Sequence, residues 1–430
     1  MNGTTLRDRL RSRTALLVLA ALVVVAAVVV VGVRVTGGSG SREGVASPAA
    51  PASTSAPGTQ SSPTPTPTPT PAPPTATGRT VSALDAGAAG DGRTDDTQAL
   101  QRALDGLAAG ETLELPAGRT FAHGDVLRIR TAGVTLGGGG TLLATNEARS
   151  SVEVDADSVV VRDVTLSTAT TTRRWTSPQQ TGLWLGAHSG ITVFDVSVLG
   201  SASAGVFVQG ATDFKLLSVT VQNSRADGIH ITGGARNGTV DHATTRSTGD
   251  DGVAVVSYLG DPSQVDGITI TAPSVHDSKA RGVSVVGGAD VHITDVDVQD
   301  TSAAGVYVAG ERGGSATRVP SEVTVQGGTV QQANTDASID HGAVLIYNGA
   351  GGDLRDVTIS GLHISGTRTS ASRQVGLLID GNGTISGVTL DRLSFTGAGP
   401  TTLLQSDGGQ IGYRATRWTK DGRAVADVTG

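Results

Sequence analysis

Three aspartates stand beside the glycines of two consecutive repeats: Asp227 and Asp251 at equivalent places, and Asp250 next to Asp251. Asp227 precedes a glycine in ADGIHI, and Asp250 and Asp251 precede a glycine in GDDGVAV. If the two segments pair as neighbouring strands, equivalent side chains lie about 4.7 to 4.9 Å apart. Carboxylates that close cannot all ionise freely, so the pKa of at least one should rise, as a general acid requires. The pattern predicts acid/base chemistry by carboxyl groups.

The same alignment predicts further residues on this face. Arg281 stands one coil after Asp251 at the equivalent position, and His230 lies two residues after Gly228. The positions equivalent to His230 carry Trp184, Phe207 and Tyr307, and alternation predicts that these side chains point outward. We predict that all five bind substrate, the aromatic rings by stacking on sugar faces. The alternative is structural, because Asp before Gly is also common in tight turns.

These residues must be positioned by a repeat in which glycine precedes an apolar, variable, apolar triplet. The glycines are Gly182, Gly205, Gly228, Gly252, Gly282 and Gly305, at spacings of 23, 23, 24, 30 and 23 residues. Such spacing predicts coils of three short strands stacked by parallel pairing. Gly342 and Gly376 are expected to continue the series, with coils to about Phe395. YLGDPSQVDG and ERGGSATRVPSE are expected to be loops that wall a groove.

The fold class predicted is therefore all-β, a single-stranded right-handed parallel β-helix covering residues 78–430. Its opening contains a helical pattern capped by Thr94 or Asp95, with an apolar stripe. The stripe consists of Ala99, Leu100, Ala103, Leu104 and Leu107. We expect this helix to cover the open N-terminal end of the coil, where unpaired strand edges would otherwise attract other chains.

Two segments precede this domain. Residues 14–35 contain twenty uncharged residues in succession, enough for a transmembrane helix, and four arginines within residues 1–13 predict a cytoplasmic N-terminus. A cleaved secretory signal is the alternative. Residues 36–77 are rich in Pro, Thr and Ser and predict a disordered stalk. The sequence thus predicts a single-pass membrane protein whose β-helix domain is extracellular.

Composition excludes several classes of function. The formal net charge of -7 argues against nucleic acid as a partner, and the absence of cysteine excludes disulfides, thiolate zinc sites and thiol nucleophiles. The histidines show no metal-ligand spacing, so no metal and no cofactor is predicted.

NSRADGIHI followed by STGDDGVAV resembles the paired aspartate motifs of polygalacturonase-type glycoside hydrolases, within the pectin-lyase-like β-helix proteins. The resemblance implies that Asp250 protonates the leaving glycosidic oxygen and that Asp227 and Asp251 activate water. It implies a polysaccharide substrate. The chain departs from that family at KARGVSVVGG, where Arg281 stands in the place of the family's histidine. The family's Arg and Lys pair, which holds a uronate carboxylate, has no match in AGVYVAG, where Tyr307 offers stacking instead.

Two alternatives stay open at this point. A polysaccharide lyase would use the aspartates to hold Ca²⁺ and Arg281 to remove a proton. A β-helix can also bind glycans or serve as structure without catalysis, because a fold does not prove an activity.

Overall fold

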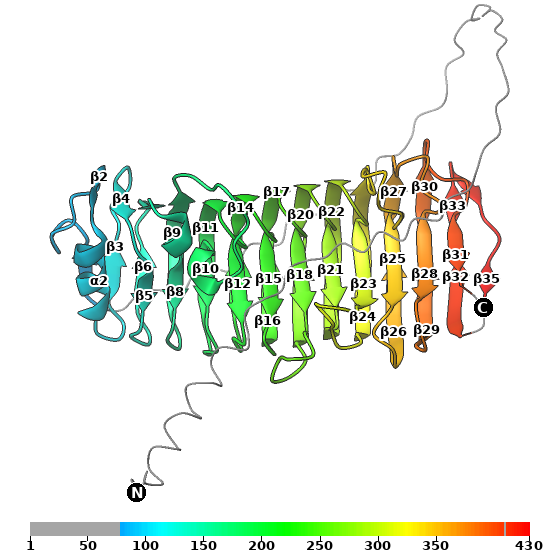
Figure 1. The fold of residues 1–430 in the computed structure, drawn as a ribbon, viewed down its shortest axis with the longest axis horizontal. Helices are drawn as coiled ribbons and strands as arrows, with labels where there is room; N and C mark the ends of the chain where they lie inside the picture. Colours follow the sequence, from blue (N-terminus) through cyan, green and yellow to red (C-terminus); the bar gives the residue numbers. More distant parts are fainter. Residues whose placement is uncertain (1–77, 408–409) are drawn as a thin grey trace, which may run out of the picture. The chain divides into compact units, whose positions relative to one another are not determined.

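The computed structural model describes residues 78–407 and 410–430. Its core is a parallel β-helix in which each coil contributes one strand to each of three faces (Figure 1). The predicted transmembrane helix and stalk lie outside the described residues. Within the described ranges, no helix is long and apolar enough to cross a membrane.

One face is an 11-stranded parallel sheet that carries the glycine repeat. Its strands are β5 (Leu127–Ile129), β8 (Val152–Val154), β10 (Leu183–Leu185), β12 (Val206–Gln209), β15 (Ile229–Thr232), β18 (Val253–Val256), β21 (Val283–Val286), β23 (Val306–Gly310), β25 (Val344–Asn348), β28 (Val375–Ile379) and β31 (Leu404–Ser406).

The other two faces form one 24-stranded sheet, because long strands bend around the corner between them. The strands are β1 (Thr80–Ser82), β2 (Asp91–Asp95), β3 (Thr112–Glu114), β4 (Thr120–His123), β6 (Thr135–Gly137), β7 (Thr141–Ala144), β9 (Val160–Thr168), β11 (Thr192–Ser201), β13 (Lys215–Leu217), β14 (Thr220–Ser224), β16 (Arg236–Asp241), β17 (Thr244–Thr248), β19 (Asp266–Thr271), β20 (Ser274–Ser278), β22 (Ala289–Thr301), β24 (Ser321–Gln331), β26 (Asp353–Ser360), β27 (His363–Ser365), β29 (Thr384–Asp391), β30 (Ser394–Thr396), β32 (Ile411–Thr416), β33 (Thr419–Lys420), β34 (Arg423–Ala424) and β35 (Val428–Thr429).

Stacked aliphatic side chains fill the coil. Val206, Ile229 and Val253 pair in register along the 11-stranded sheet, and all three are fully buried. Each repeat glycine lies against a β-branched residue of another face: a Cβ at Gly205 would be 2.2 Å from Cγ1 of Val221. At the six repeat glycines a Cβ would collide with the opposite face, which explains why these repeats begin with glycine.

A short helix covers the N-terminal end, as predicted. Helix α2 (Thr97–Asp105) begins slightly later than expected, with Asp96 as its N-cap residue, and buries Leu100 and Leu104. Gln101 binds the exposed edge of β5, since its amide donates to the carbonyl of Arg128 and accepts from the Arg128 N–H, both at 2.9 Å. Among residues 78–407 and 410–430, the other helical elements are two 3-10 turns, Glu147–Arg149 and Pro178–Gln180.

Two details of the predicted repeat are wrong. Val344 pairs with Val306, and Val375 pairs with Val344. The residues aligned with the repeat glycines, which we call the glycine column, are therefore Ala343 and Gln374. Gly342 and Gly376 do not lie in this column. The insertions before β25 and β28 change the register. The coils also continue past Phe395, because β31, β32 and β33 extend all three faces by another coil. The strands β34 and β35 then pair antiparallel with β33 and β32.

Candidate functional site

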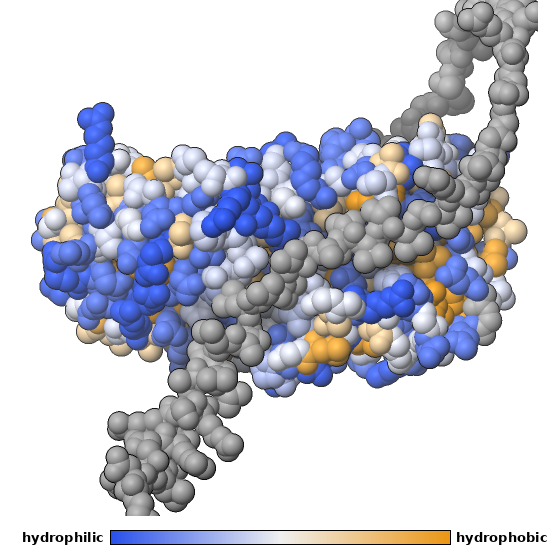
Figure 2. All heavy atoms as spheres, viewed as in Figure 1, coloured by the Kyte–Doolittle hydropathy of each residue, from blue (hydrophilic) through white to orange (hydrophobic). Residues whose placement is uncertain are grey.

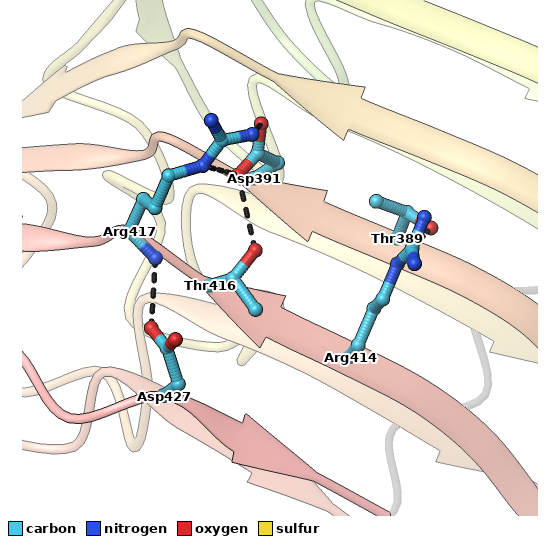
Figure 3. A pocket seen from close by; sticks show the side chains of 6 residues that line it. All are labelled: Thr389, Asp391, Arg414, Thr416, Arg417 and Asp427. Carbon is cyan, nitrogen blue, oxygen red and sulfur yellow. Dashed lines mark hydrogen bonds and ion pairs between the residues drawn. The ribbon is translucent and has the colours of Figure 1, made fainter.

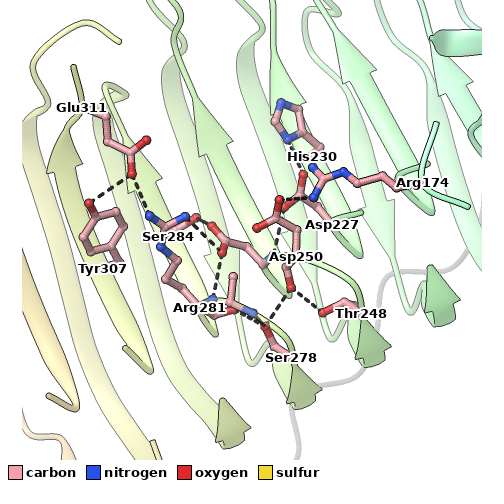
Figure 4. Close-up of polar contacts among 12 residues, drawn as sticks. Arg174, Asp227, His230, Thr248, Asp250, Ser278, Arg281, Ser284, Tyr307 and Glu311 are labelled. Atoms are coloured by element: carbon pink, nitrogen blue, oxygen red, sulfur yellow. Dashed lines mark hydrogen bonds and ion pairs between the residues drawn. The ribbon is translucent and has the colours of Figure 1, made fainter. Parts of the chain in front are cut away.

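The three aspartates lie at the turns that lead into β15 and β18, on the outside of the 11-stranded sheet (Figure 4). One carboxylate oxygen from each of Asp227, Asp250 and Asp251 lies within 4.8 Å of the other two. The alignment of the repeats therefore places the predicted catalytic residues together in the structure.

The carboxylates are also part of the turn structure. Oδ1 of Asp227 accepts from the backbone N–H of Asp251 at 3.0 Å, and Oδ1 of Asp251 accepts from the backbone N–H of Arg281 at 2.8 Å. We call this series the carboxylate ladder. The structural interpretation of the Asp-Gly pairs is therefore partly right, because one oxygen of Asp227 and one oxygen of Asp251 bind the backbone of the next coil. The other oxygens make side-chain contacts.

Asp227 pairs with His230 on the outer face. Nδ1 of His230 lies 2.8 Å from Oδ2 of Asp227, and both residues are buried. Burial alone would raise the pKa of Asp227, but the hydrogen bond from His230 and the positive charge of Arg174 outweigh it and place the pKa below its ordinary range. Asp227 is thus held ionised.

Asp250 contacts an arginine from a distant loop. Nη1 of Arg174 lies 2.6 Å from Oδ2 of Asp250, and the Asp250 side chain is 25% exposed. The loop that carries Arg174, residues 169–182, is fixed by hydrogen bonds from Arg225 to Thr171. Burial and the negative charge of Asp227 raise the pKa of Asp250, although Arg174 and Arg281 lower it in part. Asp250 is the most accessible of the three carboxyl groups and retains its proton more readily than an ordinary aspartate.

Asp251 is the most enclosed of the three. Its side chain is 5% exposed, Oγ of Ser284 donates to its Oδ2 at 2.6 Å, and Nη1 of Arg281 lies 3.7 Å from its Oδ1. Burial raises the pKa of Asp251 to about 7, against the opposing effect of Arg281. This carboxyl group therefore exchanges its proton near neutral pH.

Arg281 links the aspartates to the next coil. Its Nη2 lies 2.7 Å from Oε1 of Glu311, and its guanidinium carbon lies 4.4 Å above the ring of Tyr307. Burial would lower the pKa of Arg281, but the acidic groups of Asp251, Tyr307 and Glu311 raise it well above its ordinary value. Arg281 is therefore a permanent cation.

Tyr307 does not have the exposed ring that the sequence predicts. It points outward in register with Ser284, but it is only 3% exposed. Arg281 covers one side, the ring of His341 stacks at a centroid distance of 5.5 Å, and the hydroxyl donates to Glu311 at 3.1 Å. Loop packing that the repeat does not encode encloses the ring, so no face is open to a sugar.

Trp184 and Phe207 do remain partly exposed, as the alternation predicts. Their register along β10, β12 and β15 places them in one column with His230. Phe207 stacks on His230 with ring centroids 4.9 Å apart and planes 5° apart. The aromatic column therefore leads directly to Asp227.

The aspartate cluster is a poor fit for calcium. Ca²⁺ requires six to eight oxygen ligands. Here the oxygens of Asp227 and Asp251 already accept hydrogen bonds from His230, Ser284 and backbone N–H groups. On the remaining carboxylate, that of Asp250, Oδ2 is paired with the guanidinium of Arg174. The residues present favour a charge-balanced acid/base site over a cation site.

Several residues around the aspartates are not among the eight predicted site residues. The aspartate pattern does not identify Arg174, Tyr258, Glu311 or His341. Arg174 lies in a basic loop and Glu311 in a predicted wall loop, but their contacts depend on loop paths that no period encodes. Tyr258 stacks over His230 at 6.2 Å, in the loop that follows β18.

A pocket remote from the aspartates does not resemble an acid/base site. It has a volume of about 420 Å³, lies near the C-terminus and is lined by Thr389, Asp391, Arg414, Thr416, Arg417 and Asp427 (Figure 3). Nε of Arg417 donates to Asp391 at 2.7 Å, and the backbone N–H of Arg417 donates to Asp427 at 2.9 Å. These contacts fasten the terminal strands to the last coil.

Comparison with known proteins gives a family match. The family described as rhamnogalacturonase A/epimerase, pectate lyase-like, matches residues 80–307, slightly more than half of the chain and the part that contains all eight predicted site residues. A comparison with curated protein sequences finds no match.

Solved structures share the fold at low sequence identity. The mannuronan C-5 epimerase A-module from Azotobacter vinelandii has a TM-score of 0.53 and 16% identity, covering 77% of this chain and 98% of that chain. An exopolygalacturonase from Thermotoga maritima has a TM-score of 0.57 and 13% identity, with 83% and 95% covered. A surface adhesin of Streptococcus pneumoniae has a TM-score of 0.60 and 13% identity, with 79% and 89% covered.

Proposed function

Because the chain belongs to the rhamnogalacturonase A/epimerase, pectate lyase-like family, we propose that it is a glycoside hydrolase acting on a polysaccharide, with Asp250 as general acid and Asp227 as general base. One observation carries the proposal. Three carboxyl groups lie within 4.8 Å, and their surroundings hold Asp227 ionised while favouring the protonated form of Asp250. A pair of carboxyl groups in opposite states is what hydrolysis of a glycosidic bond needs.

The proposed reaction moves two protons. Asp250 donates its proton to the glycosidic oxygen as the bond from that oxygen to the anomeric carbon breaks. Water attacks the anomeric carbon, and its proton passes to the carboxylate of Asp227, which His230 orients through Nδ1. Asp251, whose pKa is about 7, lies beside both groups and serves as the second member of the water-activating pair.

The carboxyl separation bears on stereochemistry. Oxygens within 4.8 Å are nearer the roughly 5 to 5.5 Å typical of retaining enzymes than the 6.5 to 9.5 Å typical of inverting ones. Proton NMR of the first product tells whether Asp227 acts on water or attacks the anomeric carbon directly.

Hydrolysis is favoured over elimination by the state of Arg281. A lyase base must lose a proton, but the acidic neighbours of Arg281 raise its pKa well above the ordinary value. The crowding of the carboxylate oxygens by N–H and O–H donors also argues against the calcium ion that the lyase alternative needs.

We further propose that residues 14–35 anchor the protein in a membrane with the β-helix outside the cytoplasm. The uncharged run and the arginines before it support this topology. Membrane fractionation with protease protection tests it.

The activity test measures reducing ends released from polygalacturonate, mannuronan and α-1,3-glucan, with and without EDTA. We expect release that EDTA does not change and that Asp250→Asn abolishes. Asp266→Asn, a change at an exposed carboxylate on β19, is the matched control and should retain activity. Binding of a polymer without release would contradict the hydrolase proposal and favour a glycan-binding β-helix.

A further inference from the structure

The outer surface of the 11-stranded sheet differs on the two sides of the aspartates. Toward the C-terminus, the outward residues Ala254, Ser284, Tyr307 and Leu345 are all buried, at 3% exposure or less. Toward the N-terminus, the equivalent column is partly open at Trp184 and Phe207. A glycan that reaches the aspartates along this face therefore has room on one side only.

Two loops close the C-terminal side. Tyr258, after β18, forms an antiparallel bridge with Thr317, after β23, and the N–H of Leu259 donates to the carbonyl of Ala316 at 3.1 Å. Beneath them lies an outer apolar cluster that is separate from the coil interior. Its buried members are Ala254, Val256, Val286, Ala304, Tyr307, Ala309 and Leu345. On this half of the domain, Figure 2 shows hydrophobic residues at the surface near the lower ends of β18 and β21 and again near β28 of Figure 1.

The N-terminal side has the features of a sugar-binding surface. Nε1 of Trp184 donates to Oε1 of Gln209 at 3.1 Å, and the ring lies against Gly186, where a Cβ would come within 2.7 Å of it. The ring is thus held flat in a fixed orientation. Planar rings beside polar side chains are suited to the CH faces and hydroxyls of a sugar.

The next residues of the column extend this surface. Arg128 and Glu153 follow Trp184 toward the N-terminus, and Nε of Arg128 lies 2.7 Å from Oε2 of Glu153. The Arg128 side chain is 29% exposed, whereas that of Glu153 is 8% exposed. Glu153 therefore positions Arg128, whose guanidinium offers donors to ligand hydroxyls.

We propose that the groove is one-sided: a glycan lies over Phe207, Trp184 and Arg128 with its terminal residue at the aspartates, so the protein acts at chain ends. The action at chain ends rests on the proposed function, whereas the binding of a glycan over these three residues does not. From the Trp184 strand to the strand after Asp251 there are three strand spacings, or about 14 Å. A single sugar residue does not span this distance, so contact with both places needs an oligosaccharide.

Binding is tested first, in the full-length protein carrying Asp250→Asn so that nothing is consumed. The probes are hexasaccharides of α-1,3-linked glucose and of galacturonate, monitored by tryptophan fluorescence and calorimetry. We expect Trp184→Ala to weaken hexasaccharide binding about tenfold, the usual weight of one stacked ring, and to leave disaccharide binding unchanged. Trp184→Phe should restore most of the loss. Leu199→Ala, on β11 of another face, is the control.

The chain-end geometry is tested with the same hexasaccharides carrying a bulky cap on one end. A one-sided groove predicts that capping one particular end abolishes binding and capping the other does not. Equal binding of both capped forms would show that the groove is open at both ends and would overturn the proposal. Binding that does not depend on Trp184, or no binding of either probe, would overturn the binding surface.

Product analysis of the active protein separates this inference from the proposed function. Uniform short products, released while the viscosity of the polymer falls only slowly, support action at chain ends, whereas a ladder of internal fragments overturns it. If no polymer is cleaved but Trp184 is needed for binding, the hydrolase proposal fails and the one-sided binding surface stands.

Discussion

Replacing Asp251 by Asn should stabilise the protein, and more so at neutral than at acid pH. The carboxyl group is buried, and its pKa is raised from 3.8 to about 7 in the folded protein. Protons bind the folded state more tightly, so the contribution of Asp251 to stability is fully present below about pH 4 and is lost as pH rises to 7. Asparagine has no charge to bury and avoids that loss.

The size of the effect follows from the pKa change. At about 1.4 kcal/mol per pKa unit, ionised Asp251 costs roughly 4 kcal/mol in the folded state. The advantage of Asp251→Asn should therefore grow by about 1.4 kcal/mol per pH unit between pH 4 and 7 and then level off. The amide oxygen can still accept from the Arg281 N–H, and the amide nitrogen can donate to Ser284, so both hydrogen bonds survive.

The assay is urea unfolding followed by circular dichroism at pH 4.5, 6 and 8, with Asp266→Asn as the control for loss of an exposed carboxylate. The reasoning is refuted if Asp251→Asn is destabilising at pH 8, or if its advantage is largest at pH 4.5. Either result would mean that the attraction to Arg281, 3.7 Å away, exceeds the cost of burial.

Further expectations concern the other site residues and the coil. Arg174→Ala should raise the pKa of Asp250 and move the basic limb of the kcat/KM profile about one pH unit upward, while Arg174→Lys should move it less; an unmoved limb would show that Asp250 is not the acid. Gly205→Ala should destabilise the coil by about 1 to 3 kcal/mol in thermal or urea unfolding, because its Cβ would lie 2.2 Å from Val221, whereas Gly260→Ala, with open space around it, should be neutral. Dialysis against EDTA should leave polysaccharide cleavage unchanged, and recovery of a lost activity by added Ca²⁺ would instead support the lyase.

Much of the fold could be predicted because the β-helix repeats with a period that the sequence displays. The register at Asp227 and Asp251 follows from glycine spacing alone, and that register brings their carboxylates together. Pattern matching fails where insertions intervene. Gly376 precedes an apolar pair, as the repeat glycines do, yet it stands two positions further along than the glycine column.

The surroundings of the aspartates could not be predicted in the same way. Arg174 meets Asp250 across 76 residues, and Glu311 meets Arg281 across 30, through loops whose paths depend on packing at the coil corners. The same loops enclose Tyr307, so an outward position did not mean an exposed one. Alternation tells which face a side chain takes, but only the loops decide whether that face is covered.

The carboxylate ladder has a consequence for how such a protein can change. Because Asp227 and Asp251 each accept a backbone N–H from the following coil, the acids keep their spacing through the coil itself. The loops after β18 and β23 leave from corners and supply none of these bonds. They can be lengthened, shortened or exchanged while the acids stay in place, so new substrate preferences can arise by loop replacement without rebuilding the reactive centre.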